Sequence, residues 1–198
     1  MSSLSDLFPA GAGKEVSFTA SGAVANGDTV ILNSNGTVTS VSGQNYAAGS
    51  QGDASTTSGD SCAGVFDSNS NKVVVSWEDS NNSYAAVGTV SGSSITFGSA
   101  VQYLTNRDAN TTHMAFDSGS NRIVISYRDD GPGANNYGQV IVGSVSGSSI
   151  SFGTAVTYVS GTVTEPRVVY DSTNDKTVVF FKDSTDSYRL KGIVGTVS

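Results

Sequence analysis

Residues 72–79 read Lys-Val-Val-Val-Ser-Trp-Glu-Asp, and the pattern returns as Arg-Ile-Val-Ile-Ser-Tyr-Arg-Asp at 122–129 and as Lys-Thr-Val-Val-Phe-Phe-Lys-Asp at 176–183. The copies start 50 and then 54 residues apart. Near-continuous runs of branched aliphatic and aromatic residues are typical of β-strands that are covered on both faces. Repetition at this spacing predicts a protein built from stacked structural units.

Each copy lies within a longer unit for which the sequence predicts four strands. The first strand ends at an aromatic residue before a polar Asp-Ser turn, and the repeated stretch is the second strand. The third leads through Ser-Gly-Ser-Ser into a short fourth strand, Ile-x-Phe, at 95–97 and 150–152. Four strands in about 50 residues are typical of a β-propeller blade. We expect an all-β fold with propeller-like four-stranded β-repeats, in units at about 61–110, 111–163 and 164–198.

The third unit is incomplete in this sequence. Residues 194–198, Val-Gly-Thr-Val-Ser, match the third strand of the earlier units, and the following Gly-Ser-Ser-Ile is not present. We therefore expect two complete repeats and one incomplete repeat. Two interpretations remain open. The sequence is part of a longer protein, or a neighbouring chain or the N-terminal module completes the last sheet and covers its edge.

Residues 1–13 are expected to form an N-terminal arm, in which three large apolar residues precede a flexible stretch at 9–13. One interpretation is a disordered terminus. The other is a docking segment, because exposed Leu and Phe side chains require cover. Its apolar anchors would be Leu4, Leu7 and Phe8.

Residues 14–42 differ from the repeats and are expected to form a small β-hairpin module. The signal is Asn35-Gly36 between two β-rich runs, which favours a tight hairpin turn. Residues 43–60 are rich in Gly, Ser, Thr and Gln, so we expect a linker or long loop there.

The composition excludes several classes of partner. The 198 residues carry a formal net charge of −7, which argues against nucleic acid and against an anionic membrane surface. No apolar run approaches the roughly 20 residues of a membrane span. The start lacks a secretory signal, so we expect synthesis in a host cytoplasm. The single cysteine, Cys62, excludes an intramolecular disulfide and is expected to be a small buried residue.

No pattern in the sequence predicts a catalytic residue, a cofactor or a metal. The Asp-x-Asn-x-Asn run at 67–71 is similar to the opening of a calcium loop. The second copy has Gly119 at the middle position and no closing Glu follows, so a turn is the preferred interpretation. His113, the single histidine, has no counterpart in the other units, and we expect it at the surface or in a loop rather than in a triad.

Three aspartates, Asp79, Asp129 and Asp183, recur at the ends of the repeated strands. A glycosidase requires two carboxylates at a fixed separation, whereas these residues occur once in each unit. We therefore expect them to cap turns by accepting hydrogen bonds from backbone N–H groups.

Trp77 shares a face with branched aliphatic residues, as do its counterparts in the other two units, and is expected in the core.

A second set of recurring aromatic residues, three tyrosines, follows loops whose length differs between units. Loops that vary on a constant scaffold are where recognition is usually found. If the protein has a receptor-facing surface, we expect it at the tyrosines just past these loops, namely Tyr84, Tyr137 and Tyr188.

Two parts of the chain resemble phage proteins. Residues 7–14, Leu-Phe-Pro-Ala-Gly-Ala-Gly-Lys, with the strands and hairpin of 16–38, resemble the start of tail-fibre and other virion appendage proteins of tailed phages, notably marine cyanophages. The run Val-Gly-Thr-Val-Ser-Gly-Ser-Ser-Ile-Thr-Phe-Gly at 87–98 resembles repeats in long structural proteins of the same viruses. The resemblance implies a virion structural or adhesion protein with residues 1–42 as its attachment module. It places no catalytic residue on this chain.

The favoured hypothesis is a non-enzymatic virion subunit, a tail fibre or appendage, that forms homo-oligomers and contacts other virion proteins. Its repeats would project toward a host-surface glycan, with no nucleic acid, membrane or cofactor involved. One alternative is a capsid or tube decoration protein whose repeats only pack on the particle. A further alternative is a fragment of a propeller-type glycan hydrolase.

Overall fold

Of the chain, the computed structural model describes residues 17–41, 47–107, 109–133 and 135–198. The predicted all-β fold is confirmed, because the described elements are strands apart from one short 3-10 helix, η2, at Ser184–Asp186. The chain divides into two compact units, Met1–Ala47 and Ala48–Ser198, which we call the N-terminal unit and the repeat unit. In the described part of the chain, no helix is long and apolar enough to cross a membrane.

The N-terminal unit contains a three-stranded sheet. Its strands, in the order β1-β3-β2, are Thr19–Ala20, Thr37–Ser40 and Val30–Leu32. β2 and β3 form the expected hairpin, and Gly36 adopts a φ of 80° in its turn, where glycine avoids steric strain. β1 pairs in parallel with β3, which was not predicted.

The first repeat forms one antiparallel sheet of five strands. The strands are β4 (Asp60–Asp67), β5 (Lys72–Asp79), β6 (Asn82–Ser91), β7 (Ser94–Phe97) and β8 (Val101–Leu104). β4, β5 and β6 pair in sequence order, and β7 and β8 both pair with β6, one with each half. The predicted fourth strand is β7, and β8, which follows after Gly98, is a fifth strand that was not predicted.

The second and third repeats share a strand. The strands are β9 (Ala109–Asp117), β10 (Arg122–Asp129), β11 (Tyr137–Ser146), β12 (Ser149–Phe152), β13 (Val156–Asp171), β14 (Lys176–Asp183) and β15 (Arg189–Gly195). The first half of β13 pairs with β11, and its second half pairs with β14. The expected separate strands are therefore one strand, because the branched β-formers of residues 156–164 keep the chain extended through Ser160-Gly161.

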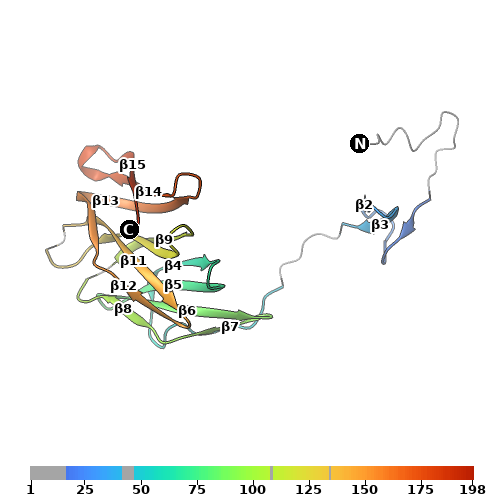
Figure 1. The fold of residues 1–198 in the computed structure, drawn as a ribbon, viewed down its shortest axis with the longest axis horizontal. Coiled ribbons are helices and arrows are strands. Elements are labelled where there is room, and N and C mark those ends of the chain that lie inside the picture. Colours follow the sequence, from blue (N-terminus) through green and yellow to red (C-terminus); the bar gives the residue numbers. More distant parts are fainter. Residues whose placement is uncertain (1–16, 42–46, 108, 134) are drawn as a thin grey trace. The chain divides into compact units, whose positions relative to one another are not determined.

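The sheets of the repeat unit are not closed into a ring. The sheet that contains β13 runs in the order β15-β14-β13-β11-β10-β9, with β12 beside β11. Figure 1 shows the repeat unit progressing from β5 and β6 in green to β14 and β15 in orange and red. Among the described residues β15 pairs with β14 alone, so the third repeat has three strands and an open edge.

Two apolar cores lie between successive repeats. The first joins the first and second repeats and includes Val74, Ile123 and Tyr127. The second joins the second and third repeats and includes Val124 and Phe181. Because side chains alternate along a strand, β10 supplies Ile123 to one core and Val124 to the other. The prediction of a central strand covered on both faces is confirmed for β10.

Each repeat carries the same irregularity in its first strand. Ser61, Thr111 and Glu165 have φ values of 47°, 51° and 51°, and strand pairing shifts by one residue beside each of them. Such β-bulges bend a strand and redirect its side chains. The bulges were not predicted, because non-glycine residues disfavour positive φ.

The structure divides residues 43–60, which were expected to form a linker, between the two compact units. Residues 48–59 belong to the compact repeat unit, where Ser50 forms a parallel bridge to Ser94. A Cβ at Gly49 would lie 2.0 Å from the Ser93 carbonyl oxygen, so only glycine permits this close approach. The segment therefore packs along β7, and we call residues 48–59 the covering segment.

Candidate functional site

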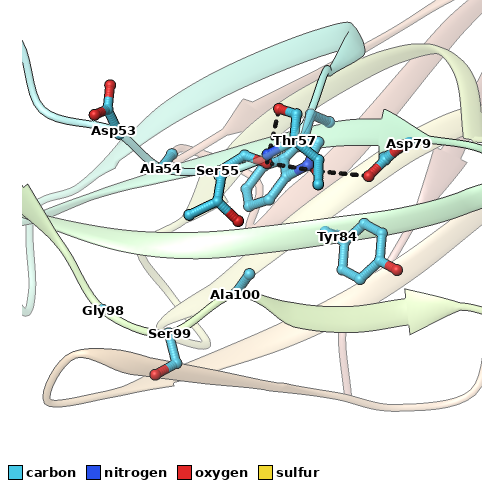
Figure 2. Close-up of a pocket in the computed structure, with 11 residues that line it drawn as sticks. Asp53, Ala54, Ser55, Thr57, Asp79, Tyr84, Gly98, Ser99 and Ala100 are labelled. Carbon is cyan, nitrogen blue, oxygen red and sulfur yellow. Dashed lines mark hydrogen bonds between the residues drawn. The ribbon is translucent and has the colours of Figure 1, made fainter.

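A cleft of about 420 Å³ lies between the covering segment and the sheet of the first repeat. Its walls come from the covering segment, from β5 and β6, and from the link between β7 and β8. Figure 2 shows Thr57 directed toward Asp79, with Tyr84 below them and Asp53 at the far side. The cleft therefore brings together segments that are more than 40 residues apart in the sequence.

An aromatic pair forms one wall of the cleft. Trp77 on β5 and Tyr84 on β6 are directly opposite in the strand pairing. Their ring centroids are 5.9 Å apart and the rings are inclined by 20°. Trp77 is only 6% exposed and packs against Gly59, so its expected core position is confirmed. Tyr84 is half-buried, and Trp77 supports it from the adjacent strand.

Asp79 supplies the carboxylate of the cleft. Its Oδ2 accepts a hydrogen bond of 2.5 Å from Thr57 Oγ1, and its Oδ1 accepts one of 2.8 Å from Ser80 Oγ. These hydrogen bonds, first from Thr57 and then from Ser80, lower the pKa of Asp79 below its ordinary value. The carboxylate is therefore ionised at neutral pH and can accept further hydrogen bonds.

A local turn fixes the hydroxyl that meets Asp79. The Thr57 N–H donates to Ser55 Oγ at 3.1 Å, and the two side-chain hydroxyls are 3.0 Å apart. Side-chain hydroxyls that bond to nearby backbone are typical of Ser and Thr in turns. Ser55 thereby orients Thr57. The sequence predicted a linker at Ser55 and Thr57, although the run Ser-Thr-Thr at 55–57 favours a turn of this kind.

The three recurring aspartates differ in their partners. Asp129 is fully buried, accepts from the Gly131 N–H at 3.1 Å and forms an ion pair with Arg107. Asp183 accepts from the Thr185 N–H at 2.9 Å and pairs with Lys191 Nζ at 2.7 Å. The predicted capping of backbone N–H groups is therefore confirmed at these two positions. At Asp79 it is wrong, because the carboxylate accepts its hydrogen bonds from the hydroxyls of Thr57 and Ser80.

The three recurring tyrosines are not structurally equivalent. The residues opposite the counterparts of Trp77 are Gln139, facing Tyr127, and Lys191, facing Phe181. Tyr137 is the first residue of β11, and Tyr188 is a 63% exposed loop residue with a φ of 58°. The longer second and third loops move these tyrosines out of register with Tyr84. In the first repeat, an aromatic pair of directly opposite residues therefore lines a cleft.

His113 was expected at the surface or in a loop; it lies within β9 and is half-buried, so the loop position is wrong. Its Nδ1 accepts a hydrogen bond of 3.3 Å from the Val168 N–H on β13. Burial lowers the pKa of His113, and the nearby Arg167 lowers it further. The neutral imidazole therefore links the first strands of two repeats, which is a structural role.

The Asp-Ser runs form turns, as predicted. In each repeat one carboxylate oxygen accepts two backbone N–H groups of the following turn, at Asp67, Asp117 and Asp171. In the part of the chain that the structure describes, no group of three His, Cys, Asp or Glu side chains could hold a metal ion. Cys62 is exposed beside the bulge in β4, so its expected burial is wrong. The predicted anchors Leu4, Leu7 and Phe8 lie outside the described residues.

Comparison with known proteins gives no relative for this chain. A scan of protein-family models, a search of curated proteins and a search of solved structures each found no match. The functional argument therefore depends on the residues of the chain itself.

Proposed function

We propose that the protein is a non-enzymatic structural subunit of a phage virion, a tail fibre or appendage, and that the cleft of the first repeat binds a host-surface glycan. One observation carries the glycan assignment. The Trp77–Tyr84 pair, the ionised Asp79 and the Thr57 hydroxyl all line one open cleft. The resemblance of the N-terminal residues and of the repeats to phage appendage proteins supports the virion assignment.

The chemistry of the cleft matches the two kinds of surface on a sugar ring. The C–H face of a pyranose is apolar and packs on an aromatic ring such as Tyr84. Sugar hydroxyls donate to a carboxylate, and charge-assisted bonds of this kind are stronger than neutral ones. Asp79 is available for such bonds because it is ionised. A volume of about 420 Å³ suits one or two sugar residues.

The same proposal assigns a role to the rest of the chain. The N-terminal unit and the anchors Leu4, Leu7 and Phe8 attach the subunit to other virion proteins, and the repeats project outward. In the same proposal the stacked repeats are propeller-like blades, and the subunit forms homo-oligomers. The support for this is the repeated face-to-face packing through two similar apolar cores.

An array of bacterial surface oligosaccharides tests the glycan assignment. The unaltered protein is expected to bind a subset of the array, and Tyr84→Ala is expected to weaken that binding at least tenfold, about 1.4 kcal/mol. Tyr188→Ala is the matched control, because this tyrosine is exposed outside the cleft, and it is expected to bind normally. Absence of any bound glycan, or equal binding by Tyr84→Ala, would contradict the assignment.

One observation favours glycan hydrolysis as a second candidate. Asp53 lines the same cleft as Asp79, so two carboxylates are present there. A general acid requires a raised pKa, whereas hydrogen bonds lower the pKa of Asp79, so Asp79 could serve only as the base or nucleophile. Release of reducing ends from a bound oligosaccharide, lost in Asp79→Asn, would replace the binding assignment with this one.

A further inference from the structure

The aspartates that end the repeated strand of the second and third repeats each have a cationic partner. Asp129 forms an ion pair with Arg107, and Asp183 forms one with Lys191 Nζ at 2.7 Å. Both aspartates are buried, and a buried carboxylate is costly unless a partner compensates its charge. The recurring position therefore carries a neutralised carboxylate in these two repeats.

Asp79 occupies the same position in the first repeat, but its described partners are neutral. Its two carboxylate oxygens accept hydrogen bonds from the hydroxyls of Thr57 and Ser80. The described residues that line the cleft include no lysine, arginine or histidine. The negative charge of Asp79 therefore lies in the wall of the cleft without a cation beside it.

Acidic residues are concentrated in the part of the chain that forms the cleft. Residues 48–106 contain five acidic side chains and one lysine, a net charge of −4. Residues 107–198 contain nine acidic and eight basic side chains, a net charge of −1. Asp53 adds a second carboxylate to the lining of the cleft. A cleft lined by charge of one sign concentrates ligands of the opposite sign, so this cleft favours a cation.

The aromatic wall of the cleft adds to the attraction for a cation. The register pairs Asp79 with Asn82 and Trp77 with Tyr84, so Asp79 and Tyr84 (Figure 2) are diagonal neighbours on one face of the sheet. The face of an aromatic ring is electronegative and attracts an ammonium group that lies over it. One ligand can therefore contact the carboxylate with an ammonium group and the Tyr84 ring with an apolar face.

We propose that the cleft selects glycans that carry a free, protonated amino group, an inference that rests on the glycan-binding function proposed above. The ammonium group of the sugar takes the place at Asp79 that Arg107 and Lys191 hold at the other two aspartates. It donates a charge-assisted hydrogen bond to the carboxylate, while the sugar ring packs on Tyr84. An N-acetylated sugar keeps the ring but lacks the charge, so it binds more weakly.

Calorimetric titration of the full chain with the glucosamine disaccharide and with its N-acetylated form tests this selectivity. At about pH 6 the sugar amine is protonated and the Asp79 carboxylate is ionised. The amino form is expected to bind at least about tenfold more tightly than the acetylated form. Added salt should weaken binding of the amino form more than that of the acetylated form, because salt screens the attraction between charges.

Asp79→Asn removes the charge and keeps a similar shape, so this variant is expected to lose the preference and bind both disaccharides with similar affinity. Asp60→Asn is the matched control. Asp60 is exposed on β4 of the same repeat and is not among the residues that line the cleft. This variant has the same net charge as Asp79→Asn and should retain the preference. Circular dichroism establishes that each variant is folded.

The outcomes separate failure of the amino-sugar assignment from failure of glycan binding. Equal affinity for the two disaccharides, binding of neither, or a preference that persists in folded Asp79→Asn overturns the amino-sugar assignment. The glycan-binding function stands in each of these cases if the protein binds glycans of the array and Tyr84→Ala weakens that binding. Failure of every array glycan to bind overturns both.

Discussion

At the scale of single residues, the recurring aspartates show how one repeated side chain acquires different roles. The strand position is constant, whereas the partners come from segments that differ between repeats. A hydroxyl of the covering segment meets Asp79, while Arg107 and Lys191 meet Asp129 and Asp183. Asp79 can still form a charge-assisted hydrogen bond with a ligand, because its partners are neutral hydroxyls rather than a cation.

Asp183 makes the stability of the third repeat dependent on pH. Hydrogen bonds from Lys191 first, and from Thr185, lower its pKa to about 2. An aspartate in an unfolded chain has a pKa of about 3.9, so the folded state binds this proton less tightly. The stabilisation is therefore complete above about pH 4 and is lost as the pH falls toward 2.

Urea unfolding at several pH values measures this effect. The free energy of unfolding of the unaltered protein is expected to fall more steeply between about pH 4 and pH 2 than that of Asp183→Asn. The substitution removes the titrating group while keeping a similar shape. Parallel pH profiles for the two proteins would contradict the role of Asp183.

Part of the cleft could be predicted from single residues, and part could not. Tyr84 was identified because it follows a variable loop, whereas Asp79 was expected only to cap a turn. Thr57 was missed, because its approach to Asp79 depends on packing between segments 22 residues apart in the sequence. The inequivalence of Tyr137 and Tyr188 was missed for a similar reason, since loop length decides which residue faces the aromatic of the preceding strand.

At the scale of elements, β10 is the strand on which both cores depend. Ile125 is fully buried in the first core, and Ile125→Ala is expected to lower the free energy of unfolding by about 3 kcal/mol. The loss combines the transfer of the removed methylenes with the cavity they leave. Denaturant unfolding measures it.

The matched control is Val169→Ala on the neighbouring β13. This valine is 46% exposed, so its truncation should cost less than about 1 kcal/mol. Equal losses for the two variants would show that the first core does not depend on β10.

The strands were the most predictable elements, because alternation and turn residues are local signals. The Asn-Gly hairpin and the Asp-Ser turns were both confirmed. The fusion of two expected strands into β13 was missed, as were the bulges at Ser61, Thr111 and Glu165. These features require tertiary contacts to hold positive φ at non-glycine residues or to fix where a strand changes partner.

At the scale of the whole molecule, the chain is two compact units rather than one. The repeat unit begins at Ala48 and includes the covering segment. Removal of residues 1–47 is therefore expected to leave the free energy of unfolding of the repeat unit unchanged within about 0.5 kcal/mol. Urea unfolding followed by the fluorescence of Trp77, the single tryptophan, reports on this unit alone.

A truncation that begins at residue 61 is the informative comparison. It also removes the covering segment, which packs on Trp77 through Gly59 and bonds Asp79 through Thr57. It should therefore lose stability where the first truncation does not. A large loss on removal of residues 1–47 alone would show that the two units depend on each other.

The continuous strand β13 also has a genetic consequence. This strand ends one repeat and begins the next without a turn, so strand pairing continues across the boundary between these repeats. Unequal recombination that gains or loses one repeat length of coding sequence is therefore expected to preserve strand pairing where the two copies join within such a strand.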